Sequence, residues 1–298
     1  MILHRIIAYL FFFLLISTNS NVFAEIRNFQ TTKLKSTAGA GVGAILFEES
    51  SFLNPAPLAF YNTSSIYLQK GDANQTQLNN SGNEEKNSLG SKAIIFTDAG
   101  GALKGSFSYV KQSYDLDSRE QFTGSFAANL GEKSALGASL LVKKDTLYSN
   151  GQFINDNYEQ AIIGVTHIVD ENLNFGLSLY DPFRAKEGET KAIFGMQYLY
   201  GACLSFLLDI GADYKEDLEE NYIYKAASQI KFLNDFYLRF GIFRDKGKKE
   251  RGNGIGLSWV SPRLTAEVAQ SIIKKEESLD LTNSSEISEF TFSFAFLF

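Results

Sequence analysis

The sequence predicts an all-β fold, a transmembrane antiparallel β-barrel of about fourteen strands, and three observations support this prediction. Most of the chain after residue 63 consists of short segments in which apolar residues alternate with polar or small ones. Aromatic residues make up 14% of the 298 residues while prolines number only 4, a composition that suits many strands. The last segment alternates phenylalanine with small residues up to the final position. Such strands suit a wall with lipid on one side and a lumen on the other.

Residues 1–24 are expected to form a signal peptide that directs export in a Gram-negative cell. Arg5 precedes the apolar run from Ile6 to Ile16, and small residues up to Ala24 suit signal peptidase. The run is shorter than the roughly 20 apolar residues of a membrane-spanning helix. We therefore predict cleavage after Ala24, an N-terminal segment at residues 25–62, and a barrel at residues 63–298 in the cell outer membrane.

Within the predicted barrel, charged residues occur at positions that alternate with apolar ones. Apolar residues occupy every second position in the segments 136–142, 173–179, 236–242, 255–259 and 264–268. A charged side chain on the lipid face would cost about 2–4 kcal/mol near the middle of the bilayer. We therefore predict that four charged side chains face the lumen: Arg239, Glu267, Lys143 and Asp209.

Connections of two kinds alternate along the chain and predict the number of strands. Short turns are predicted at residues 98–101, 130–133, 169–172, 200–202, 233–235 and 260–263. Long polar loops are predicted at residues 71–89, 112–118, 146–157, 181–190, 214–221, 245–251 and 271–286. Thirteen connections join fourteen strands, and in this class of barrel the short turns lie on the periplasmic side.

The apolar stretch 192–210 also fits a membrane helix, so two structures compete for it. Lys191 and Asp209 border the stretch, and Gln197 interrupts it. Residues 200–202, Tyr-Gly-Ala, are suited to the tip of a hairpin. We predict a hairpin, because it keeps the alternation of the rest of the chain.

The last strand has one aromatic face. Phenylalanine occupies every second position up to the end of the chain, at Phe290, Phe292, Phe294, Phe296 and Phe298. Successive strand side chains point to opposite faces, so these rings are predicted to meet lipid. The pattern resembles the terminal signal that the barrel assembly machinery recognises.

Residues 25–62 do not alternate, and part of this segment resembles a known family. The Gly-rich stretch 38–44 lacks the Lys-Ser/Thr of a phosphate loop, which argues against nucleotide binding. The stretch 48–59 resembles one in the FadL-type outer-membrane transporters and their PorV-like relatives, with Asn54, Pro55, Ala56 and Leu58 as the matching residues. The resemblance implies that residues 25–62 fold into the barrel and plug its lumen.

Composition argues against several classes of function. A net charge of −6 disfavours nucleic acid, whose binding depends on Lys and Arg. Cys203 is the only cysteine, so no internal disulfide forms. After residue 24 the only histidine is His167, beside a predicted short turn. We therefore expect neither catalysis, nor a metal site, nor a cofactor.

Charged loops could touch partners. Acidic residues at positions 216–220 and basic residues at positions 246–251 could contact divalent ions and lipopolysaccharide phosphates, or simply be solvated. The expected partners are outer-membrane lipid and lipopolysaccharide, the assembly machinery and a hydrophobic small molecule.

The FadL resemblance implies a channel that passes small hydrophobic solutes past the plug. The alternative is a PorV-like barrel that transports nothing and anchors or shuttles partner proteins. A general polar porin is disfavoured if the plug is real, because an open water channel has no need of one.

Overall fold

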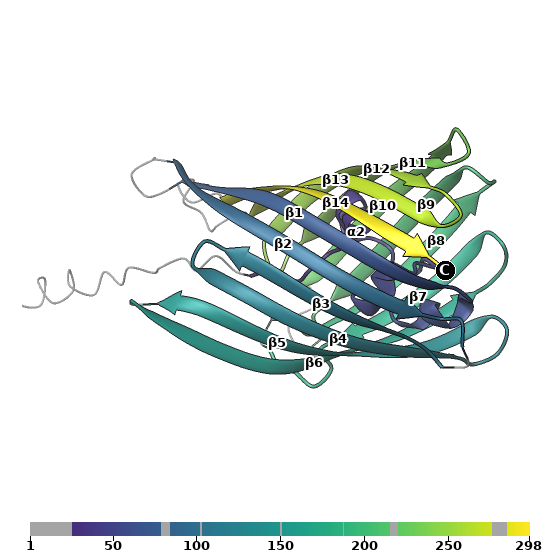
Figure 1. The fold of residues 1–298 in the computed structure, drawn as a ribbon, viewed down its shortest axis with the longest axis horizontal. Helices are drawn as coiled ribbons and strands as arrows, with labels where there is room; N and C mark the ends of the chain where they lie inside the picture. The colour runs from purple at the N-terminus through teal and green to yellow at the C-terminus, as the bar shows by residue number, and fades with distance from the viewer. Residues whose placement is uncertain are drawn as a thin grey trace, which may run out of the picture.

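The chain forms a closed barrel of fourteen strands (Figure 1). The computed structural model describes residues 26–78, 84–101, 103–149, 151–186, 188–214, 220–275 and 285–298, so the predicted signal peptide lies outside the described residues. Each strand pairs antiparallel with the next, and β1 closes the barrel by pairing with β14. The prediction of a fourteen-stranded antiparallel barrel is confirmed.

The strands follow in chain order. Their bounds are β1 Ser64–Leu78, β2 Glu84–Asp98, β3 Lys104–Tyr114, β4 Asp117–Asn129, β5 Ser134–Ser149, β6 Gln152–Ile168, β7 Leu173–Tyr180, β8 Lys191–Tyr200, β9 Leu204–Ala212, β10 Tyr222–Phe232, β11 Phe236–Asp245, β12 Glu250–Val260, β13 Leu264–Lys275 and β14 Ser285–Leu297. Before them come three short helices, α2 Thr32–Ser36, η1 Glu48–Ser51 and η2 Ala56–Phe60.

Alternation along each strand separates an apolar outer face from a small or polar inner face. In β14 the rings of Phe292, Phe294 and Phe296 are exposed, whereas Thr291 and Ser293 between them are buried. The other strands repeat this pattern, with Phe126 on β4 and Phe240 on β11 among the exposed rings. Soluble proteins rarely expose large contiguous apolar surfaces, so this outer face is suited to lipid.

The apolar stretch 192–210 forms a hairpin, as predicted. It contributes to β8 and β9, which pair from Ala192 with Ala212 to Tyr200 with Leu204. Among the described residues, the helices are all too short or too polar to cross a bilayer.

Three of the predicted long loops were wrong in extent. We predicted loops at residues 71–89, 112–118 and 146–157, but paired strand continues through most of each range. β3 and β4 pair up to Tyr114 and Asp117, and β5 and β6 up to Ser149 and Gln152. Beyond the lipid both faces of a strand can be polar, so the alternation disappears while the backbone hydrogen bonds persist.

The segment 26–62 lies inside the barrel, where α2 is seen behind β14 (Figure 1). α2 contacts β12 and β13, whereas η2 contacts β4 and β5 on another part of the wall. The Thr31 side chain caps α2 by accepting a hydrogen bond from the Leu34 N–H at 3.3 Å. The Thr32 N–H donates to Oε1 of Gln69 on β1 at 2.8 Å, which ties the helix to the wall. The interior of the barrel is therefore packed with its own N-terminal chain.

Candidate functional site

Glycines on the inner wall make room for the backbone of the segment 26–62. A Cβ added to Gly254 would lie 1.9 Å from the carbonyl oxygen of Lys35, and one added to Gly176 would lie 2.1 Å from that of Val42. Five further glycines would clash with the segment in the same way, namely Gly137, Gly164, Gly195, Gly241 and Gly256. Because the seven glycines come from six strands, the seat for the segment extends around much of the wall.

We expect Gly254→Val to release the segment from β12. The valine side chain has no room beside the Lys35 carbonyl, so either the wall or the segment must move. Limited trypsin digestion of the barrel in liposomes should then cleave after Lys33 or Lys35, as mass spectrometry would show. Gly124→Val is the matched control, because Gly124 lies on the outer face with no atom within 4 Å of its added Cβ. Equal protection of both variants would contradict the tight seat.

The motif singled out from the sequence lies at the centre of the segment's contacts. The Asn54 side-chain amide donates to the Val42 carbonyl at 2.9 Å and to Oγ1 of Thr166 at 3.0 Å, and its oxygen accepts from the Ala56 N–H at 3.1 Å. Pro55 lies against Gly137 and Gly164 of the wall. Ala56 and Leu58 are fully buried in an apolar cluster with Phe47. The motif therefore joins two turns of the segment to β5 and β6.

The structure places Asp209 on the inner face of β9, where it binds the Gly-rich stretch. Its carboxylate accepts hydrogen bonds from the Gly41 N–H at 2.9 Å and the Val42 N–H at 3.2 Å. Lys225 on the neighbouring strand donates to the Gly39 carbonyl at 3.0 Å. An acid and a base on adjacent strands thus satisfy donors and acceptors of one loop.

Arg239 and Glu267 also point inward and form one network. An Nη1 of Arg239 lies 3.2 Å from Oε1 of Glu267, and the Arg239 Nε donates to Gln229 at 2.6 Å. Ser258 donates to the same Glu267 oxygen at 2.9 Å and contacts the guanidinium as well. Both charged side chains are only 4% exposed, so each depends on the other for its stability.

Lys143 belongs to a second network that sequence reasoning found only in part. Its ammonium donates to Asn28 at 2.7 Å and lies 3.2 Å from Glu189. Burial of Glu189 opposes its ionisation, but Lys143 and other neighbouring donors lower the pKa of this carboxyl to about 2. Arg119 and Asp145, which we did not predict as site residues, also belong to this network. The Arg119 guanidinium donates two hydrogen bonds to the Asp145 carboxylate, at 2.6 and 2.7 Å. It also donates to the Ile26 carbonyl at 3.1 Å.

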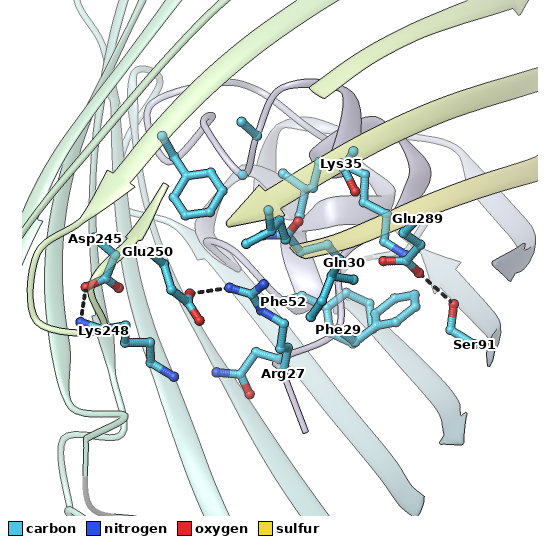
Figure 2. Close-up of a pocket in the computed structure, with 18 of the residues that line it drawn as sticks. Arg27, Phe29, Gln30, Lys35, Phe52, Ser91, Asp245, Lys248, Glu250 and Glu289 are labelled. Atoms are coloured by element: carbon cyan, nitrogen blue, oxygen red, sulfur yellow. Dashed lines mark hydrogen bonds and ion pairs between the residues drawn. The ribbon is translucent and has the colours of Figure 1, made fainter. Parts of the chain in front are cut away.

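A cavity of about 210 Å³ lies between the segment and the inner wall (Figure 2). Its apolar lining includes Phe29 and Phe52, whose rings meet edge to face at 5.0 Å. The other part of the lining is ionic. Three ion pairs contribute to it, namely Arg27 with Glu250, Lys35 with Glu289, and Lys191 with Asp245. The cavity can therefore hold a solute with an apolar body and accept a polar end.

A smaller cavity of about 50 Å³ is lined by the same two rings. It shares Asn28, Phe29 and Phe52 with the larger cavity, and Leu141 and Lys143 complete part of its lining. Phe29 and Phe52 therefore line both cavities, and the N-terminal chain supplies both rings.

Of the remaining candidate residues, Lys248 of the basic loop lines the larger cavity, whereas the terminal phenylalanines and His167 do not. The five terminal phenylalanines are exposed on the outer wall, and the backbone of Phe298 pairs with that of Ser64. His167 lies 2.8 Å from the Ser134 hydroxyl, on the outer face beside a short turn. Of the predicted acidic loop, only Glu220 is among the described residues. In the basic loop, the Lys248 N–H donates to Asp245 at 3.0 Å.

Comparison with solved structures identifies the fold. The Ralstonia pickettii toluene transporter TbuX aligns with a TM-score of 0.68 and 8% identity, over 91% of this chain and 99% of that chain. The monoaromatic hydrocarbon channel CymD aligns with a TM-score of 0.67 and 10% identity, over 90% of this chain and 97% of that chain. A Pseudomonas aeruginosa FadL homologue aligns with a TM-score of 0.64 and 11% identity, over 90% of this chain and 98% of that chain. No family model and no curated protein matches the sequence. The chain thus has the fold of the FadL-type transporters.

Proposed function

We propose that this protein is an outer-membrane channel of FadL-like type, which passes small hydrophobic solutes past an N-terminal segment that plugs the lumen. The observation that carries the proposal is the cavity of about 210 Å³ that the segment and the wall line together. A solute in this cavity touches both the fixed wall and the chain that blocks its way. Binding and opening can therefore be linked through the same side chains.

The chemistry of the lining supports a hydrophobic or amphiphilic cargo. Phe29, Leu34 and Phe52 come from the segment, and Ile193 and Ile273 come from the wall. The charged groups are largely paired with one another, which leaves few of them to hold a strongly polar solute. A hydrophobic solute would be transferred from water to an apolar surface, with about 25 cal/mol gained for each Å² buried.

The form of the barrel supports placement in the outer membrane. The short turns and the C-terminus lie at one end, and the longer strands project at the other (Figure 1). In outer-membrane barrels the short turns face the periplasm. The predicted signal peptide at residues 1–24 fits the same route. The segment 25–62 would then close the lumen between the larger cavity and the periplasm.

Uptake by whole cells tests the proposal, because an intact outer leaflet slows the direct passage of hydrophobic solutes. A strain that expresses the protein should take up labelled toluene faster than the parent strain, while uptake of a sugar of similar size should not change. Ile273→Gln should reduce toluene uptake several-fold, because Ile273 lines the cavity. Ile272→Gln is the matched control, since Ile272 is the adjacent residue and faces outward.

Other outcomes distinguish the alternatives. Faster uptake of sugar as well as toluene would indicate a polar porin. If neither solute enters faster, the transport proposal fails, and a barrel that binds partner proteins becomes the better hypothesis.

A further inference from the structure

Four lysines form a row across the outer wall of the barrel. In the strand register Lys70 on β1 lies opposite Lys92 on β2, which lies opposite Lys111 on β3. Lys111 lies opposite Glu120 on β4, which in turn lies opposite Lys144 on β5. All four lysines are exposed, and their strands are neighbours on the near wall of Figure 1. We call these five residues the basic row.

The basic row stands where the apolar outer face ends. On β1 the outward residue before Lys70 is Leu68, and the outward residue after it is Asp72. On β5 Val142 precedes Lys144 and Thr146 follows it. The other three strands change from apolar to polar residues at the same register position, after Ile94, Tyr109 and Phe122. Along each strand, in the direction away from the short turns, the row is therefore the first polar level beyond the apolar face. Lipid headgroups would lie at this level.

The charges of the basic row are not balanced within the barrel. Lys70 lies 3.2 Å from Asp72, and Lys111 lies 3.0 Å from Glu120. Lys92 and Lys144 form no salt bridge with another residue in the described ranges. Neighbouring strands are about 4.8 Å apart, so Lys92 stands between two like charges at that spacing. Like charges directly opposite each other destabilise a sheet, and a bound anion would remove the repulsion.

The basic row ends at β1. The register partner of Lys70 on β14 is Phe292, and Val268 and Leu257 continue that level on β13 and β12 without charge. A second set of outward basic residues, Arg244, Arg251 and Lys274, lies at another register level on β11 to β13, next to Glu286 on β14. The basic row is therefore a separate cluster of charges on β1 to β5, and such a cluster can hold an anionic ligand at a defined place.

We propose that the basic row binds the phosphate groups of a phosphorylated glycolipid of the outer leaflet, with the acyl chains of the glycolipid lying on the apolar face below. The row spans four strand spacings, about 19 Å, which accommodates a headgroup with more than one phosphate. Lysine side chains are long enough to reach headgroups while their stems lie on apolar surface. The proposal rests on the outer-membrane placement given above and is independent of transport.

Binding of bisphosphorylated lipid A to the full barrel in detergent micelles tests the proposal. The double variant Lys92→Gln/Lys144→Gln removes the two lysines that lack a salt bridge. We expect its affinity for lipid A to fall about ten-fold or more, since each lysine near an anionic surface contributes about five-fold. The control Lys133→Gln/Arg263→Gln removes two positive charges from the short turns at the opposite rim and should bind lipid A like the unchanged protein.

Phosphatidylglycerol serves as the second probe, because it is anionic but carries one phosphate and no sugar. A loss for lipid A that is much larger than the loss for phosphatidylglycerol supports the proposal. Unchanged lipid A affinity in the Lys92/Lys144 variant overturns it, and so does an equal loss in the control variant or with both lipids. Because the assay involves no solute uptake, a barrel that binds lipid A but passes no toluene would refute only the transport function.

Discussion

Deletion of residues 25–60 should convert a closed barrel into one that conducts ions in a planar bilayer. The deletion leaves β1 intact from Ser64, so the pairing of β1 with β14 still closes the wall. It removes the chain that now covers seven inward glycines, and these positions would then face water. We expect stable current steps from the deleted form and little or no current from the mature protein.

The comparison requires proof that both forms are folded. Folded barrels of this class resist detergent and migrate differently from heated samples on a gel, which checks each preparation before it is inserted. Gly254→Val in the full chain should give intermediate behaviour, with current that appears and disappears, because only one contact of the segment is lost. Steady current from the mature protein would contradict a plug, and silence from both forms would contradict a channel.

Alternation was the part of the sequence that carried most information about the fold. A residue such as Arg239 sits between Leu238 and Phe240, and only one orientation keeps a charge out of lipid while exposing the two apolar side chains. The same argument oriented most of the strands and the hairpin at residues 191–212. It failed at residues 112–118 and 146–157, because a strand outside the bilayer does not need an apolar face. The backbone hydrogen bonds that hold such a strand form with any side chains, so the residue types do not reveal them.

The sequence predicted which single residues face the lumen, but not which distant residues they contact there. Asp209 had to face the lumen, yet its two amide donors lie 168 and 167 positions away in the Gly-rich stretch. Arg119 lies between Ser118 and Glu120 rather than between apolar residues, so the reasoning that found Arg239 could not identify it. The seven inward glycines leave free volume next to the wall. Only the closed barrel shows that residues 26–62 occupy that volume.

Glu267→Ala should lower the free energy of unfolding by about 3–5 kcal/mol, because it leaves the buried guanidinium of Arg239 without its counter-charge. Ser258 and Gln229 would still accept hydrogen bonds from Arg239, but neither carries a negative charge. The double variant Arg239→Met/Glu267→Leu should lose much less, since it leaves no unpaired charge. Urea unfolding of the refolded barrel in lipid gives the three values and completes the comparison.

A matched surface pair shows whether the loss comes from burial. Lys274 and Glu286 lie 2.8 Å apart and are about half exposed, with values of 54% and 46%. Glu286→Ala should therefore change the free energy of unfolding by less than about 1 kcal/mol. If Glu267→Ala were as mild as Glu286→Ala, water would have to reach Arg239 from the lumen. The interior around α2 would then be wet, and the segment would not seal that side of the barrel.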